Sequence, residues 1–141
     1  MAERFKAGET IIELLRQEGV SHIFGIVGSS FLAVLDPLYD RTDIQFIGVR
    51  HEQGAALMAD GFSRISGAPS VCLVTNGPGV LNLTYGIASA YVANSPVVVL
   101  APSASRSHQY RDSTQEFDQV SLFRPITKAA FPVNTIERLP D

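Results

Sequence analysis

The sequence predicts an α/β domain with a doubly wound, mainly parallel sheet and helices on both faces. Segments with the 3.6-residue periodicity of amphipathic helices alternate along the chain with short apolar runs that are typical of strands. Short connections rich in Gly, Pro and Asn separate these segments. Because parallel neighbouring strands require helical crossovers, this regular alternation favours a doubly wound sheet.

Composition limits the classes of protein that the chain can represent. Its 141 residues, 45% hydrophobic and 18% charged, suffice for one domain with a buried core. The net charge of −3 is spread without blocks, which disfavours nucleic acid and membrane lipid as partners. Cys72 lies in an apolar run and is expected to pack as a small hydrophobe in a reducing compartment. The longest apolar run, 96–102, is too short to span a bilayer and no export signal is visible, so we expect a cytoplasmic protein.

The first part of the chain predicts a helix, a strand and a second helix. Apolar residues recur at helical spacing over 6–18, and a short strand is predicted over 22–27. Residues 31–39 have a helical pattern, and Ser29 or Ser30 can cap its first turn. The order of elements is therefore helix, strand, helix.

The middle of the chain continues this alternation. A strand over 44–49, a helix over 52–66, a strand over 70–75 and a helix over 80–93 are predicted in turn. The helix over 80–93 contains no charged residue, which indicates burial on more than one side. The strand over 97–101 is wholly aliphatic, which suits a strand covered on both faces rather than an edge strand.

The pattern changes after this strand. The segment 102–113 is polar and predicts an extended loop. A helix over 115–123 and a last strand over 129–133 are expected to follow, and the final residues, TIERLPD, resemble a helix start cut short.

The fold directs attention to four loops, because ligands in doubly wound sheets bind at the carboxyl ends of the strands. These loops are 27–30, 50–52, 75–79 and the segment from 101 onward. The chain contains no GxSxG, GxxxxGK followed by Ser or Thr, HExxH or CxxC. Elbow hydrolases, Walker-type nucleotidases and the common zinc sites therefore lack their residues here.

The loop 75–79 leads into NGPGVLN, which runs from Asn76 to Asn82 between a strand and a helix. This arrangement resembles a dinucleotide fingerprint, so a nicotinamide-binding domain is one interpretation. However, Pro78 removes a backbone donor that a phosphate would use, and no acidic residue follows the next strand. A tight turn in which glycine avoids steric cost is at least as good an interpretation of these residues alone.

Glu52 is the sharper signal, because its carboxylate stands where an apolar strand passes into an alanine-rich helix. A carboxyl group held in an apolar pocket can share a proton with a ligand nitrogen and exchange it near neutral pH. The simpler interpretation is an acidic residue that complements the helix dipole in the first turn. On these residues alone, the simpler interpretation is the better one.

Three ordered segments change that balance: RHEQGAALMADGFSRISG, TNGPGVLNLTYGIASAYVANSPVVVLA and TQEFDQVSLFRPITK. Together they resemble the N-terminal pyrimidine-binding domain of thiamine-diphosphate enzymes, in the branch of the acetolactate synthases and sulfoacetaldehyde acetyltransferases. The resemblance covers essentially the whole chain. It implies a decarboxylase or carboligase that acts on a 2-keto acid or a similar acyl donor.

The resemblance also implies roles for individual residues. Glu52 would hydrogen-bond ring nitrogen N1′ of the cofactor's aminopyrimidine and favour the imino tautomer that removes the thiazolium C2 proton. The other implied site residues are Val27 and Gly28 beside the cleft, Thr75, Pro78 and Asn82 around the pyrimidine, and Gln115 near the thiazolium and substrate. From the residues alone, Pro78 is a turn residue, Asn82 a polar residue early in a helix, and Gln115 a solvated helix start.

The resemblance further implies a partner. Family members hold Mg²⁺ and the diphosphate with a GDG...N motif in another domain, and the chain contains no GDG. We therefore expect residues 1–141 to be a single pyrimidine-binding domain that is truncated near its C-terminus and inactive alone. A pyrimidine-binding subunit of a split decarboxylase is the alternative, as in two-chain sulfopyruvate decarboxylases.

Other expectations concern assembly and chemistry. In the family the cofactor lies between subunits, so a homodimer or tetramer is implied, while a flavin (FAD) is not indicated. The first loop reads GIVGSS, without the proline common in acetolactate synthases, and Thr114 replaces a common Phe. These departures leave the acyl donor open. A non-catalytic binding or regulatory domain of the same fold is a further alternative.

Overall fold

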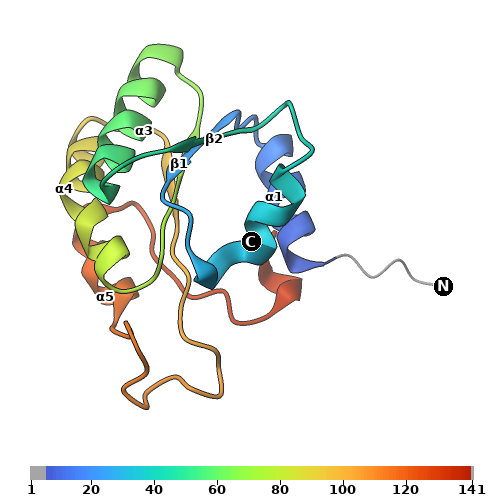
Figure 1. Cartoon of the computed structure of the whole chain (residues 1–141). Coiled ribbons are helices and arrows are strands. Elements are labelled where there is room, and N and C mark those ends of the chain that lie inside the picture. Colours follow the sequence, from blue (N-terminus) through green and yellow to red (C-terminus); the bar gives the residue numbers. More distant parts are fainter. Residues whose placement is uncertain (1–5, 141) are drawn as a thin grey trace.

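The computed structural model of the chain describes residues 6–140 and contains one sheet (Figure 1). Its four strands are parallel in the order β2-β1-β3-β4. They are β1 (His22–Gly25), β2 (Gln45–Gly48), β3 (Ser70–Leu73) and β4 (Val97–Leu100). The α-helices of the described residues are α1 (Ala7–Gln17), α2 (Leu32–Leu35), α3 (Glu52–Ser66), α4 (Pro78–Val92) and α5 (Gln119–Phe123). The predicted α/β fold with a parallel sheet is thus confirmed.

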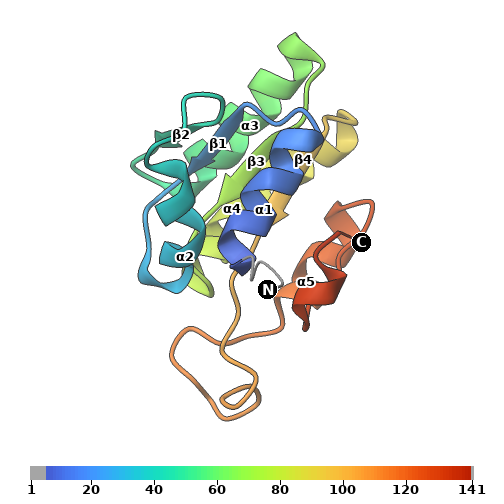
Figure 2. The same cartoon turned by 90° about the vertical axis from the view of Figure 1, so that its right-hand side faces the viewer.

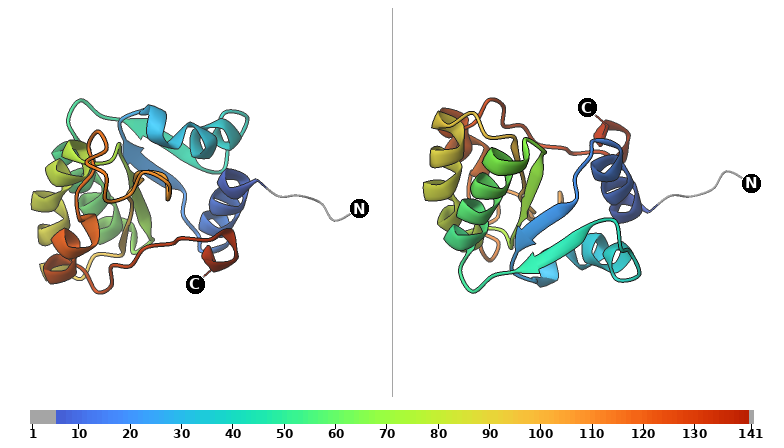
Figure 3. Two further views of the ribbon diagram at one scale, coloured as in Figure 1. Left: turned by 90° about the horizontal axis from the view of Figure 1, so that it is seen from below. Right: turned by 90° about the horizontal axis from the view of Figure 1, so that it is seen from above.

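Helices cover both faces of the sheet, as Figures 2 and 3 show. The side chains of a strand alternate between the faces, so β1 directs Ile23 to one core and Phe24 to the other. Ile23 belongs to the core under α1 and α2, together with Ile12. Phe24 belongs to the core under α3 and α4, together with Cys72 and Leu83.

Helix α3 begins and ends where the sequence predicts. His51 caps its start, since the ring Nδ1 accepts a hydrogen bond from the backbone N–H of Gln53 at 3.2 Å. Gly67 ends it with a left-handed conformation, φ 70°. The helix therefore places Glu52 at its first residue, just beyond β2.

The segment predicted as one helix over 31–39 is broken into three short turns. Two 3₁₀ turns, Ser29–Phe31 and Asp36–Leu38, flank α2. Pro37 lies within the second turn and lacks the N–H that would continue an α-helix. The predicted serine cap is also wrong, because neither turn start has a side-chain cap and the hydroxyl of Ser30 instead lies 3.0 Å from that of Thr75.

The strand predicted over 97–101 is present as β4, but the expectation that it is not an edge strand is wrong, because β4 lies at the edge of the described sheet. Val98 is 43% exposed accordingly. The strand expected over 129–133 is not formed, because these residues have no regular structure. Apolar composition alone cannot distinguish a strand covered by its own chain from one left at an edge.

Two helices also differ from the prediction. Helix α5 begins at Gln119 rather than at Gln115, because Gln115 has a φ of 64° and the carboxylate of Asp118 caps the later start. Helix α4 is buried on one side only. Its Tyr85 is 65% exposed and Leu81 is 46% exposed, so the expected burial on more than one side is not found in this chain.

Candidate functional site

The carboxyl ends of three neighbouring strands bring the predicted site residues together. Strands β2, β1 and β3 lie side by side, and shortly after their ends come Glu52, at the first position of α3, and Gly28 and Thr75, in loops. Helices α3 and α4 leave these loops on the same face of the sheet and pack against each other (Figure 1). Their first turns therefore meet above the strand ends, as ligand sites in such sheets do.

Glu52 and Asn82 form the centre of this region. The half-buried carboxylate of Glu52 accepts a hydrogen bond through Oε2 from Nδ2 of Asn82, at 2.9 Å. Among the described residues, no hydrogen bond reaches the other oxygen, Oε1. The carboxyl group is thus fixed on one side and has an open acceptor on the other.

Gly79 lies beside that open oxygen and has no side chain to cover it. A Cβ at this position would lie 3.3 Å from Oε1 of Glu52 and 3.1 Å from Cγ2 of Thr75. Thr75 also adjoins the first loop, since a Cβ on Gly28 would lie 3.1 Å from its Oγ1. A chain of neighbours therefore crosses the strand ends, from Gly28 to Thr75, then to Gly79 and Glu52. Asn82 contacts Glu52 through its other carboxylate oxygen.

Three predicted residues lie at the margin of this group. Pro78 is the exposed first residue of α4, next to Gly79. Gln115 approaches from the loop after β4, where its carbonyl oxygen accepts a hydrogen bond from Nδ2 of Asn76 at 3.4 Å. Val27 follows β1 and its side chain is 63% exposed. In the structure Gly28, Thr75 and Asn82 thus lie in the group of residues around Glu52, whereas the side chain of Val27 points largely to solvent.

Three residues that shape this region were not among the predicted site residues. Gly79 lets Thr75 and Glu52 approach closely, Ser30 links the first loop to Thr75, and buried Asn76 binds the Gln115 backbone. The glycine was visible as part of a GPG turn. The other two contacts join residues 45 and 39 positions apart, and no local pattern reports such pairs.

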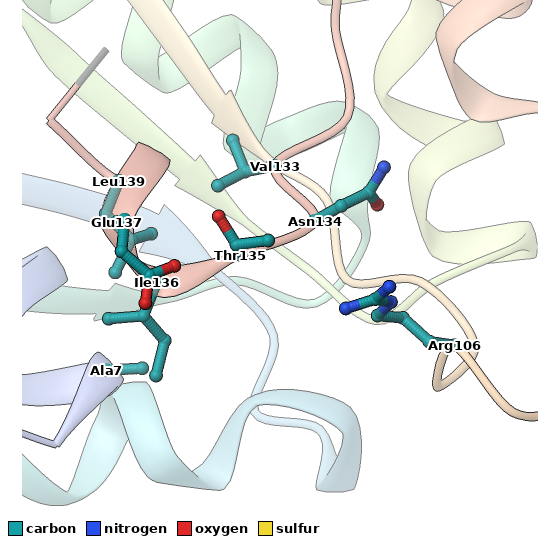
Figure 4. Close-up of a pocket in the computed structure, with 8 residues that line it drawn as sticks. All are labelled: Ala7, Arg106, Val133, Asn134, Thr135, Ile136, Glu137 and Leu139. Carbon is teal, nitrogen blue, oxygen red and sulfur yellow. The ribbon is translucent and has the colours of Figure 1, made fainter.

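Two hollows on the surface lie elsewhere. One, of about 550 Å³, is lined by Ala7, Arg106 and residues of the 133–139 segment (Figure 4). The second lies between α1 and Arg41. Neither contains a predicted site residue, and both are shallow openings rather than enclosed cavities.

Metal and membrane features can be stated for the described part of the chain. Residues 6–140 contain no cluster of three His, Cys, Asp or Glu side chains that could hold a metal ion. No helix among them has the length and apolar character needed to cross a membrane. Cys72 is a free, buried thiol, and its burial raises its pKa to about 12.

Fold and site together define the class: an α/β domain with a partly fixed carboxylate at the strand ends of a parallel sheet. Residues 5–122 match the family model described as the N-terminal TPP binding domain of thiamine pyrophosphate enzymes. The chain belongs to this family.

Several acetolactate synthases are similar to the chain over nearly its whole length. The probable acetolactate synthase large subunit of Methanocaldococcus jannaschii is 46% identical over 136 residues, which are 96% of this chain and 23% of the relative. The acetolactate synthase of Bacillus subtilis is 39% identical over 96% of the chain and 24% of the relative. The isozyme 1 large subunit of Escherichia coli is 39% identical over 98% of the chain and 25% of the relative. The chain thus spans about a quarter of the length of the curated relatives it matches.

Proposed function

We propose that the chain is the pyrimidine-binding domain of a thiamine-diphosphate enzyme of the acetolactate synthase type, in which Glu52 activates the cofactor. The observation that carries this proposal is the carboxylate of Glu52, fixed through Oε2 by Asn82 and open at Oε1 beside Gly79. Family membership and the acetolactate synthase relatives support the choice of cofactor and of a 2-keto acid as substrate.

The residues at the strand ends fit an aminopyrimidine. Oε1 of Glu52 is the group that would meet a ring nitrogen and share a proton with it. Because Gly79 has no side chain, nothing at this position covers that oxygen, and Thr75 lies next to the same point. When bound, thiamine diphosphate supplies the carbon centre at which a 2-keto acid reacts.

Asn82 orients the acid. Its amide donates to Oε2, so the carboxyl group cannot turn away from Gly79 without losing a hydrogen bond worth about 1 kcal/mol. Gly28 adjoins Thr75, and Pro78 precedes Gly79 in the chain. Gln115 reaches the same region from the loop that follows β4. We assign Gln115 to the thiazolium and substrate side and Val27 to the entrance.

The proposal includes a partner that supplies the rest of the site. A diphosphate-binding domain or subunit would hold Mg²⁺ and the diphosphate, and a homodimer or tetramer would bring it to Glu52. Two observations support this: the relatives are about four times longer than the chain, and α4 exposes Leu81 and Tyr85. The free, buried thiol of Cys72 is in line with a cytoplasmic location.

Turnover of a 2-keto acid tests the proposal. In the complete protein that contains this chain, Glu52→Gln should abolish pyruvate consumption in the presence of thiamine diphosphate and Mg²⁺. Glu18→Gln is the matched control, because it makes the same change on an exposed carboxylate at the end of α1, over the other face of the sheet. Equal turnover by the two variants would contradict the proposal.

A further inference from the structure

Helices α3 and α4 run side by side and touch at three successive levels (Figure 1). At the first level Glu52 meets Asn82, and at the second a Cβ on Gly86 would lie 2.5 Å from Cβ of Ala56. At the third level the hydroxyl of Ser89 donates to Oδ2 of Asp60 at 3.1 Å. The levels are three to four residues apart, which is one helical turn, so both helices present one continuous face to each other.

The third level joins the two helices through two hydrogen bonds, from Ser89 to Asp60 and from Arg64 to Ser89. Asp60 is only 4% exposed, and its carboxylate accepts from Arg64 through Nε at 2.8 Å and through Nη2 at 2.6 Å. Nη2 of Arg64 also donates to the hydroxyl of Ser89 at 3.1 Å, which closes a triangle between the helices. The paired guanidinium of Arg64 holds the pKa of Asp60 below its ordinary value, so the buried group stays ionised.

A second hydroxyl completes the shell of Asp60 without belonging to α4. Ser95 donates to Oδ1 at 2.5 Å, but it lies beyond the last helical residue, Val92, in the turn before β4. Ser89 and Ser95 therefore bind the same carboxylate, but Ser89 lies within α4, whereas Ser95 lies beyond it and is tied to its last turn by a backbone hydrogen bond to the carbonyl of Ala90 at 2.9 Å. This difference separates a role in helix placement from a role in general stability.

We propose that Asp60 is a positioning residue that acts through Ser89 to hold α4 where Asn82 meets Glu52. The inference rests on the proposed function, since it concerns the same carboxylate. A helix is stiff over two turns, and Gly86 allows the backbones to approach closely between the two polar contacts. Release of Ser89 therefore frees α4 to shift along α3, and the 2.9 Å contact at the first level lengthens.

The test compares Ser89→Ala with Ser95→Ala, each of which removes one hydroxyl from Asp60. In the complete protein loaded with thiamine diphosphate, Ser89→Ala should slow C2 proton exchange of the cofactor about fivefold, the factor that corresponds to one lost hydrogen bond. Ser95→Ala should slow exchange less than Ser89→Ala does, because it removes no hydroxyl from α4 itself. Equal slowing by both variants, or none by Ser89→Ala, would overturn the inference.

A double-mutant cycle distinguishes positioning from a general structural effect. If Ser89 acts through Asn82, Ser89→Ala has no further effect on exchange once Asn82→Ala has removed the amide. Independent structural damage would instead multiply the two losses.

A measurement without cofactor completes the test. In the full chain, the NMR signal of the Asn82 side-chain amide should move in Ser89→Ala toward its position in Glu52→Ala, and should move less in Ser95→Ala. An unmoved signal in Ser89→Ala refutes the inference while leaving the proposed function intact. Failure of the proposed function is a separate result, namely normal exchange in Glu52→Gln.

Discussion

At the scale of single residues, two neighbours, Asn82 and Gly79, decide how the role of Glu52 is interpreted. The sequence alone favoured a dipole-complementing acid, and Glu52 does occupy the first turn of α3. The structure adds a fixed oxygen, through Asn82, and an open one beside Gly79. A purely dipole-complementing carboxylate needs neither feature, so the two contacts favour a ligand-facing role.

Gly79 gives the first prediction at this scale. Gly79→Ala places a methyl group 3.3 Å from Oε1 of Glu52, in the space proposed for the aminopyrimidine. Overpacking of this kind costs about 1–3 kcal/mol, so thiamine diphosphate should bind about tenfold more weakly to the complete protein. Calorimetric titration measures this change, and circular dichroism checks that the fold is kept. Unchanged affinity would show that the ring does not occupy this space.

Asp60 gives a prediction about pH. Its pKa is lowered from the ordinary 3.8, chiefly by Arg64, so its stabilising contribution is complete above pH 3.8 and is lost as the pH falls through the lower native value. Asp60→Asn should cost about 1–3 kcal/mol of unfolding free energy at pH 7. The difference from the natural chain should shrink below pH 3.8, as urea unfolding at several pH values would reveal. A difference that is constant with pH would argue against an ionised Asp60.

At the scale of elements, the sequence predicted those helix ends that depend only on neighbouring residues. Helix α3 was predicted at both ends, because its residues have helical periodicity and Gly67 can adopt the left-handed conformation that ends it. The start of α5 was not predicted correctly, because the positive φ of Gln115 depends on contacts with distant residues such as Asn76. The cluster around Asp60 was also missed, since its serines come from α4 and the following turn.

The α3–α4 contact leads to a prediction of its own. Gly86→Ala brings a Cβ within 2.5 Å of Ala56 and forces the two helices apart, which should destabilise the fold by about 1–3 kcal/mol. Gly61→Ala is the matched control in α3, where a Cβ meets open space and the better helix former should stabilise slightly. Thermal unfolding of both variants measures the difference. Equal melting temperatures would contradict the close contact.

At the scale of the whole molecule, the candidate site lies at one end of the sheet, and the two helices that begin there expose apolar side chains. Leu57 and Met58 on α3 and Leu81 and Tyr85 on α4 are each 41% exposed or more. The sequence predicted that α4 would be buried on more than one side, but the described residues bury only one side of this helix. Such a patch is typical of an interface with another domain or subunit.

Tyr85 provides the prediction at this scale. Tyr85→Glu in the complete protein should shift its sedimentation toward the monomer, because a charge on the proposed interface is costly to bury. Tyr39→Glu is the matched control, since Tyr39 is 90% exposed and follows α2 on the other face of the sheet. A protein whose assembly is insensitive to both changes would place the interface elsewhere.

The central claim is that Glu52 activates thiamine diphosphate by sharing a proton with its aminopyrimidine. C2 proton exchange of the bound cofactor, followed by NMR in the complete protein, measures this step apart from substrate chemistry. Glu52→Gln keeps the size of the side chain and removes the acid, so exchange should slow by at least about a hundredfold, the range of general acid–base catalysis. Near-normal exchange in Glu52→Gln would contradict the claim.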